Sequence, residues 1–566
     1  MLIRGDGSWI PSAAIVAVSF LLTTPLTSLA ATAPMMVQFD GDTLTLNESQ
    51  TLSYVNGTRA WQFGLELEEI ALRNHAYRSA GSKGANESAD FILAEFEDLN
   101  LDSWRESFEF MAWDLRSKPQ IILDKDGDFT TLADQYSMIS FQPEHWSWHT
   151  PDGGVIARTV MLPLPVAASR SSTGLLAIDN DDWDAVDTTG AVLFIGREVR
   201  WDQNWEREFV EKITRETPAA IVYVWWYDWM GWIDSMFYSS VGGMPHGYIV
   251  DYLRSLHIPI GSVNFSDGAI AKTLVGSGNL SASVSIESIM TAGVHYNILA
   301  RMEGSIESDS LVLVTGHYDT VMSAGFCDNG AGVAGVLEVA TSLARARQEG
   351  IFLPRYTFLF IALSAEELGL IGSINYVSDH IDDIPRVVAV LNLDCIGNDV
   401  LVVSETNPAG ELDLDQVVIA SARDLDVGAV LRPTITSDHE VFRNPIAIEA
   451  SHSRNWGASA GLSTASSVAA SLTLSSSPVS FTDLWTEGSP GWIHTSRDSS
   501  DFCSSGSWID EGDLESHIKV AVLSLTRIGS HIPQEKSADM ILTCAGIVLV
   551  VTAVAATLIL LSHRMK

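Results

Sequence analysis

An apolar run that ends in polar residues decides the fold: Ser310-Leu-Val-Leu-Val-Thr-Gly-His-Tyr-Asp-Thr320. Two later segments repeat this arrangement. Residues 356–364 are mostly apolar and lead into Ala365-Glu-Glu-Leu-Gly369, and residues 387–393 lead into Asp394. The apolar residues follow one another without alternation, which is typical of strands buried on both faces of a parallel sheet. We therefore expect three buried strands, each followed at once by polar residues.

Between these runs the apolar residues change to a helical spacing. Residues 332–347 carry one apolar face, formed by Val333, Val336, Leu337, Ala340, Leu343 and Ala344. Strands that alternate with helices predict an α/β fold. In open α/β sheets, ligands bind beyond the carboxyl ends of the strands. His317, Glu366, Glu367 and Asp394 all fall at such ends.

The polar residues at the strand ends are of the kind that binds metal. With two further residues they form a set of six: His317, Asp328, Glu366, Glu367, Asp394 and His494. Histidine and carboxylates without cysteine are typical of a hydrolytic zinc site. Two metals about 3.5–4 Å apart need a bridging carboxylate, and of two adjacent glutamates one can bind metal while the other accepts a proton from water. Asp319 could accept the second ring N–H of His317 and so orient that ring.

Each of these motifs has an ordinary structural interpretation when it is taken alone. His317-Tyr-Asp319 could be a surface turn, Glu366-Glu367 the exposed start of a helix, and Asp394 an N-cap. Their order, with each motif placed after a buried strand, favours a metal site.

The motif set resembles that of the co-catalytic zinc exopeptidases of the bacterial leucyl aminopeptidase, aminopeptidase Y and glutamate carboxypeptidase II type, to which the glutaminyl cyclases are related. The similarity covers roughly residues 60–530. It rests on these segments: Arg78-Ser-Ala-Gly-Ser82 with a helix over about 87–99, Gly316-His-Tyr-Asp319, Cys327-Asp-Asn-Gly-Ala-Gly332, Ser364-Ala-Glu-Glu-Leu-Gly369, Asn392-Leu-Asp394, Ser437-Asp-His439 and Ile493-His-Thr495 with Asp498. The resemblance implies a three-layer α/β/α fold with a central mixed sheet.

The resemblance also assigns roles to the residues. It implies that His317 and Asp394 bind one zinc ion, that Glu367 and His494 bind a second, and that Asp328 bridges the two. Glu366 would be the general base, with Asp319 as the other catalytic residue. Asp438-His439 would help to shape the site. The implied reaction is attack of water on a peptide carbonyl.

The chain departs from the family pattern at three positions. Many members carry a tyrosine before the last histidine, where this chain has Ile493. Cys327 and Cys395 stand beside two of the ligand aspartates, where relatives usually have other residues. We interpret the two cysteines as packing residues, with an additional bridge and a site of oxidation as the alternatives.

A region over residues 119–290 separates an N-terminal part of the peptidase (31–118) from the catalytic part (291–535). It resembles a protease-associated domain, a small β-rich insertion. The similarity rests on Thr188-Thr-Gly-Ala-Val-Leu-Phe-Ile-Gly196, a helix over about 204–216, Ala219-Ala-Ile-Val-Tyr-Val224 and His257-Ile-Pro-Ile-Gly261. The aromatic cluster from Trp225 to Trp232 could be a substrate lid, or part of the core of the insertion with a membrane-facing loop.

Composition narrows the classes of function. The formal net charge is −38, which opposes binding to the phosphates of nucleic acid. The chain has four cysteines, too few for a disulfide framework in a protein of 566 residues. Nucleic acid is therefore not an expected partner. The resemblance implies peptide substrates, and no feature predicts an oligomeric state.

The two ends of the sequence predict membrane topology. Residues 1–30 contain an apolar stretch, followed by Ser28-Leu-Ala30 as a small-residue cleavage site. This pattern predicts a signal peptide, with a retained anchor as the alternative. Residues 540–561 carry no charge and are long enough to span a bilayer. The basic tail, 562–566, would lie in the cytoplasm. We expect a single-pass membrane protein with an extracytoplasmic ectodomain.

Three functions are compatible with these features. The first is a membrane-anchored exopeptidase, most simply an aminopeptidase, with a carboxypeptidase as its variant. The second is a glutaminyl cyclase-like acyltransferase on the same fold. The third is a binding module that has lost its metals, which the six intact positions argue against.

Overall fold

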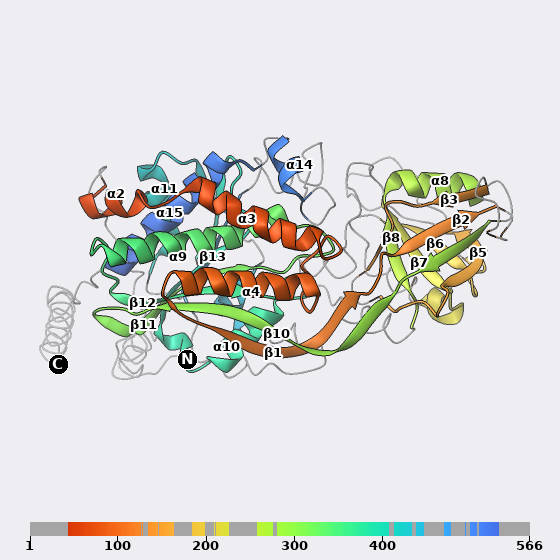
Figure 1. Ribbon diagram of the computed structural model, residues 1–566, viewed down its shortest axis with the longest axis horizontal. Coiled ribbons are helices and arrows are strands. Elements are labelled where there is room, and N and C mark those ends of the chain that lie inside the picture. Colours follow the sequence, from red (N-terminus) through yellow and green to blue (C-terminus); the bar gives the residue numbers. More distant parts are fainter. Residues whose placement is uncertain are drawn as a thin grey trace, which may run out of the picture.

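The fold was analysed in a computed structural model of the chain (Figure 1). It describes residues 44–125, 134–144, 147–162, 184–197, 211–225, 257–275, 280–406, 412–432, 437–445, 469–476, 498–505 and 509–530, with the single residues 127, 129, 209 and 493. These residues form an α/β body and a smaller body built on a second sheet, at opposite ends of the molecule in Figure 1.

Eight of the described strands form the sheet of the α/β body. In spatial order they are β1 (Asp102–Leu115), β10 (Ser288–Met302), β12 (Tyr356–Leu363), β11 (Glu307–His317), β13 (Val387–Leu393), β16 (Ser471–Ser476), β14 (Leu401–Ser404) and β15 (Ala429–Arg432). The central strands β12, β11, β13 and β16 are parallel, and β10 and the β14–β15 pair run antiparallel to them. The edge strand β1 pairs with β10 alone and runs antiparallel to it. The predicted mixed sheet is confirmed.

The central strands are buried on both faces, as their continuous apolar runs predict. In β11, Val312 and Val314 belong to one core, and Leu311 and Leu313 belong to a second core on the opposite face. Successive side chains of a strand point to opposite faces, so a strand with helices on both sides needs apolar residues at every position.

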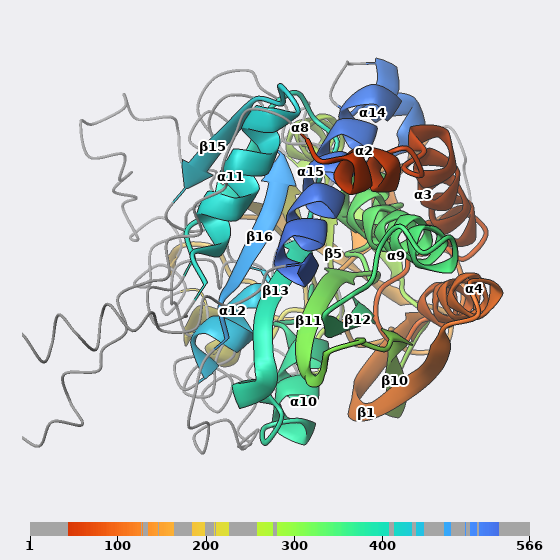
Figure 2. The same ribbon diagram turned by 90° about the vertical axis from the view of Figure 1, so that its left-hand side faces the viewer.

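Helices cover both faces of this sheet (Figure 2). The helices that contribute to the core of Val312 and Val314 include α2 (Leu46–Leu52), α3 (Gly57–Leu72), α4 (Lys83–Asp98), α9 (Gly332–Gln348), α11 (Leu414–Asp424) and α15 (Glu511–Ser530). The helices that contribute to the other core are α10 (Ile371–Asp379) and α12 (His439–Arg443). The arrangement is therefore three layers, as the resemblance implied.

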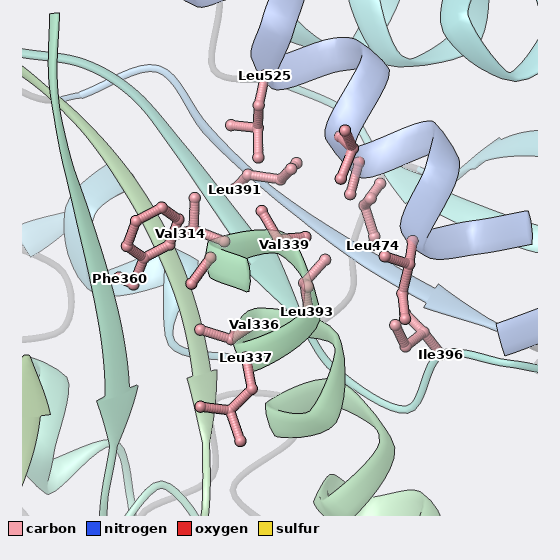
Figure 3. Packing of buried hydrophobic residues seen from close by; sticks show 14 of the residues in the cluster. Val314, Val336, Leu337, Val339, Phe360, Leu391, Leu393, Ile396, Leu474 and Leu525 are labelled. Atoms are coloured by element: carbon pink, nitrogen blue, oxygen red, sulfur yellow. The ribbon is translucent and has the colours of Figure 1, made fainter. Parts of the chain in front are cut away.

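Figure 3 shows how the larger core closes over the strands that lead to the polar edge. Val336 and Val339 of α9 and Leu525 of α15 pack with Val314 of β11 and Leu391 of β13. All five side chains are completely buried. Truncation of a buried leucine at such a position costs about 2–5 kcal/mol of stability, so this core holds the strand ends firmly.

The second sheet also contains eight of the described strands. In spatial order they are β3 (Gln135–Ser137), β2 (Gln120–Asp124), β9 (Ser281–Ser285), β5 (Val155–Met161), β6 (Val192–Arg197), β7 (Ala220–Trp225), β8 (Ile260–Val263) and β4 (Gln142–Pro143). The helix α8 (Phe265–Val275) follows β8. The long antiparallel pair β1 and β10 runs from the α/β body toward this sheet (Figure 1).

Most of the expected elements that fall on described residues are present. The three strands at 310–315, 356–364 and 387–393 and the helix over 332–347 are confirmed within a few residues. The helix expected over 87–99 begins earlier, at Lys83, because the Ser82 side chain accepts a hydrogen bond from the Ala85 N–H and caps it. Regions 188–196, 219–224 and 257–261 each contribute to a strand of a β-rich body.

The segments predicted to meet the membrane are not among the described residues. Among the described helices, none combines the length and the apolar character needed to cross a bilayer. The signal segment 1–30 and the spanning segment 540–561 lie outside the described residues, as do residues 226–232 of the aromatic cluster. The domain boundaries at 118, 290 and 535 remain predictions.

Candidate metal centre

The parallel strands bring the predicted ligands to one edge of the sheet. His317 is the last residue of β11, Glu366 and Glu367 follow β12, and Asp394 follows β13 directly. Because β11 pairs in parallel with both β12 and β13, the carboxyl ends of the three strands lie side by side. This is the edge at which α/β sheets bind ligands.

The His317 ring is the centre of the cluster. Its Nε2 atom lies 3.3 Å from Asp328 Oδ1, 3.6 Å from Asp394 Oδ1 and 3.9 Å from Glu366 Oε2. The candidate ligand atoms form two groups, and within each group all the atoms lie within 4.8 Å of one another. One group consists of His317, Asp328 and Asp394, and the other of His317, Glu366 and Glu367. The structure thus brings together five of the six predicted residues; His494 lies outside the described residues, and its neighbour Ile493 packs against the large core.

Asp328 reaches this edge from a separate turn, η4 (Phe326–Ala331), in which its backbone leaves the helical conformation. The carboxylate of Asp498 holds the turn by accepting hydrogen bonds from the Cys327 N–H at 2.6 Å and the Asp328 N–H at 3.2 Å. A carboxylate that accepts two backbone N–H groups fixes the direction in which Asp328 points.

Asn329 ties the same turn to the end of β13. Its Nδ2 donates to the Leu393 carbonyl oxygen at 2.9 Å, and its Oδ1 accepts from the N–H groups of Cys395 and Gly332, each at 3.0 Å. The turn with Asp328 and the strand end with Asp394 are therefore held at a set spacing. Asn329 belongs to a motif of the sequence but had no predicted role; an amide beside a ligand is the only signal that could have pointed to it.

Asp319 connects His317 to the glutamate pair. The Nδ1 atom of His317 lies 3.2 Å from the Asp319 backbone oxygen and 3.7 Å from its carboxylate. The carboxylate oxygens instead accept the N–H groups of Glu366 at 3.1 Å and Glu367 at 3.3 Å. The expected orienting contact is thus made mainly by the Asp319 carbonyl oxygen, while the carboxylate positions the turn after β12.

Arg78 supplies a buried positive charge behind the site. Its guanidinium donates to the backbone oxygens of Tyr318, Leu67, Ala324 and Gly325. Burial lowers the pKa of Arg78 to about 10, against the opposing effect of the carboxylates around it, including Asp498 and Asp328. The side chain therefore remains charged at neutral pH and braces the loop between β11 and η4.

The segment Ser437-Asp-His439 lies beside the strand ends, where it is hydrogen-bonded to residues of α10, β13 and β16. Asp438 is fully buried and accepts a hydrogen bond from Ser373 Oγ at 2.5 Å, and Ser437 Oγ accepts from Asn392 Nδ2 at 2.8 Å. Burial raises the pKa of Asp438 to about 7. Burial lowers the pKa of His439 to about 3, which keeps it neutral beside Thr473. This triplet packs behind the site, in agreement with a shaping role.

The electrostatics of the cluster suit a divalent cation. Burial would lower the pKa of His317, but Glu366 and the surrounding aspartates outweigh it and raise that pKa well above its usual value. Burial, together with Glu367, Asp438 and Asp394, raises the pKa of Glu366 well above the ordinary range. Crowded, buried carboxylates need a compensating positive charge. A histidine with carboxylate oxygens and no thiolate in the groups matches the donor preferences of catalytic zinc.

The part of the chain that carries this site matches the model of a known family. Residues 297–516 match the model described as peptidase family M28. This part of the chain is therefore similar to the peptidases of family M28. The resemblance drawn from the motifs is confirmed, whereas the protease-associated assignment of the insertion stays a prediction.

Two curated relatives are similar to parts of this chain. Leucine aminopeptidase 2 of Trichophyton equinum is 29% identical over 196 residues, which are 32% of this chain and 38% of that protein. The protein named "Probable lipoprotein aminopeptidase LpqL" of Mycobacterium tuberculosis is 25% identical over 335 residues, covering 59% of this chain and 57% of that one. The chain thus spans less than two thirds of the length of either relative.

A solved structure shares the fold. BSAP, a zinc aminopeptidase from Bacillus subtilis, superposes with a TM-score of 0.57 at 19% identity, covering 85% of this chain and 97% of that chain. At this identity the likeness shows the fold alone.

Proposed function

We propose that this protein is a zinc-dependent exopeptidase, and specifically an aminopeptidase. The observation that carries the proposal is the buried contact of His317 Nε2 with carboxylate oxygens of Asp328, Asp394 and Glu366 at the edge of the parallel strands. Support comes from the M28 family match and from relatives named as aminopeptidases.

The donor set fits two zinc ions. His317 and Asp394 would hold one ion, Glu367 and His494 the other, and Asp328 would bridge them, because its carboxylate lies in contact with His317 and its backbone is clamped by Asp498. Zinc bound there would lower the pKa of water and polarise the peptide carbonyl.

Glu366 would move the proton. Its side chain is 14% exposed, so it borders the buried cluster and still faces solvent. As the general base it accepts a proton from the attacking water and passes it to the nitrogen of the departing amine. Asp319 keeps the carboxylate in place through the Glu366 N–H. A general base of this kind contributes about 10²–10⁴-fold to the rate.

The test is a substrate panel with the zinc-loaded full chain. Short peptides with a free α-amino group should lose their N-terminal residue, and N-acetylation or a chelator should abolish the release. Cleavage of acetylated peptides from the carboxyl end would instead show a carboxypeptidase. Formation of pyroglutamate from N-terminal glutamine without chain shortening would show a cyclase. A Glu366→Gln variant that releases residues at the normal rate would place the base elsewhere.

We also propose that the enzyme is anchored through residues 540–561, with its M28 domain outside the cytoplasm. The proposal rests on the uncharged segment and the basic residues that follow it. The full chain should stay with membranes in alkaline carbonate, and a chain that stops before Met540 should be released in active form. Retention of the shortened chain would contradict the single anchor.

A further inference from the structure

Two thiols meet beside the candidate metal centre. Cys327 precedes Asp328 in the η4 turn, and Cys395 follows Asp394 after β13. Neither cysteine is in a disulfide, and their side chains share a hydrogen bond. Cys327 is 2% exposed, whereas Cys395 is partly exposed. Neither thiol has a part in the proposed reaction.

The backbone around the two thiols is already held in place. Asn329 binds the Cys395 N–H and the Leu393 carbonyl oxygen, at 3.0 Å and 2.9 Å, from within the turn that carries Cys327. The chain therefore approaches itself here independently of the sulfur atoms. A bond between the sulfur atoms would require rotation of the side chains rather than a new approach of the two segments.

We propose that Cys327 and Cys395 form a modification site, at which a small disulfide such as oxidised glutathione converts the two thiols to a Cys327–Cys395 disulfide. The bond would staple the turn that bears Asp328 to the strand end that bears Asp394. This inference does not depend on the peptidase activity.

The reaction proceeds by two exchanges. Cys395, the more exposed of the two thiols, gives up its proton and attacks a sulfur of the small disulfide, and one small thiolate leaves and takes up a proton. The Cys327 thiolate then attacks the Cys395 sulfur of the mixed disulfide, and the second small thiolate leaves. The protein loses two electrons and two protons; the small disulfide gains the electrons and becomes two thiols.

The Cys327–Cys395 disulfide would close a long loop of the chain. Cross-links of this kind stabilise a fold mainly by restricting its unfolded state. The gain should be clearest after the metals are removed, when the carboxylates of the centre repel one another. We expect the metal-free oxidised protein to melt at least about 3 °C above the metal-free reduced protein.

The experiment treats the full chain with excess oxidised glutathione overnight, blocks the remaining thiols with an alkylating agent in denaturant, and maps the peptides by mass spectrometry. The expected product is a peptide pair joined through Cys327 and Cys395, which a phosphine reductant separates. Alkylation of both thiols, or a glutathione adduct that goes no further, would overturn the proposal.

Two variants make the result specific. Cys503 is a buried thiol of α14 (Ser500–Ser505), and Cys327 lies close enough to contribute to the raised pKa of Cys503, so Cys503 is the competing partner. Cys503→Ala should still form the bond and show the higher melting temperature, and Cys395→Ser should do neither. Linkage of Cys327 to Cys503 would contradict the assignment of the bond. A protein that forms the Cys327–Cys395 disulfide without a change in melting temperature would contradict the predicted stabilisation.

Discussion

The two sheets of this protein share an arrangement of strands but differ at the strand ends. In both sheets, central parallel strands are buried on both faces: β11 divides its side chains between two cores, and so does β6, with Val192 and Phe194 in one and Leu193 and Ile195 in the other. Yet both candidate metal groups found among the described residues lie on the sheet of the α/β body.

The turns after the strands account for this difference. β11, β12 and β13 end in histidine and carboxylates, and the neighbouring Asp498, Asn329 and Asp319 clamp the turns that carry them. In the second sheet β8 leads directly into α8, and the Asp267 carboxylate of that helix accepts hydrogen bonds from Tyr136 and Ser140. Buried parallel strands supply the place for a site, whereas ligands and their hydrogen-bond partners supply the chemistry.

Substitution of the proposed base, Glu366, should have the largest effect on turnover. Glu366→Gln keeps the size of the side chain but cannot accept the proton, so we expect turnover to fall by at least about 10²-fold with zinc retained. Glu287→Gln, at an exposed position before β10, is the matched control and should leave kcat unchanged. Loss of zinc from Glu366→Gln would mean that Glu366 is a ligand and that Glu367 is the base.

Loss of the Asn329 clamp should have the next largest effect. Asn329→Ala frees the Asp328 turn from the end of β13, and partners of this kind typically change metal affinity by about 10–100-fold. Competition with a chromogenic chelator measures the affinity. Asn375→Ala, which removes an amide that donates to the Ile371 carbonyl oxygen on α10, is the control and should bind zinc normally. Equal affinities in the two variants would remove the clamp from the explanation.

The folding stability of the metal-free protein should depend on pH through His317 and Glu366. The folded pKa of His317 is raised, so protonated His317 contributes stability that is complete below its unfolded pKa and is lost as pH rises through the folded value. The raised pKa of Glu366 acts in the same direction, because the folded state favours its protonated form. Thermal unfolding should show stability falling as pH rises from about 5, less so with zinc bound. A metal-free protein that gains stability over this range would contradict these shifts.

A core truncation in the second sheet should have the smallest effect on the metal centre. Ile221 of β7 is fully buried, and Ile221→Ala should cost about 2–5 kcal/mol in the unfolding of its own body. Zinc affinity should not change, because none of the clamps described for the site comes from that sheet. The chelator competition assay measures the zinc affinity, and a denaturant titration measures the free energy of unfolding. A weaker zinc affinity in Ile221→Ala would show that the two bodies are coupled.

The sequence predicted the strands and five of the site residues that lie together, because both depend on local patterns. Apolar runs revealed β11, β12 and β13, and polar residues directly after them revealed His317 and Asp394. The roles of Arg78 and Asn329 could not be predicted, because each acts through backbone atoms of segments distant in sequence. The Asp319 contact differed for the same reason: its carboxylate found closer donors in the Glu366 turn than in the His317 ring.

Zinc stoichiometry measures the metal centre most directly. The full chain should be stripped with chelator, loaded with excess zinc, desalted and analysed by elemental mass spectrometry beside His317→Ala. We predict two zinc ions per chain in the unmodified protein and fewer in the variant, because His317 contacts both ligand groups. Saturation at one ion, or equal zinc content in the two proteins, would contradict a two-metal centre built around His317.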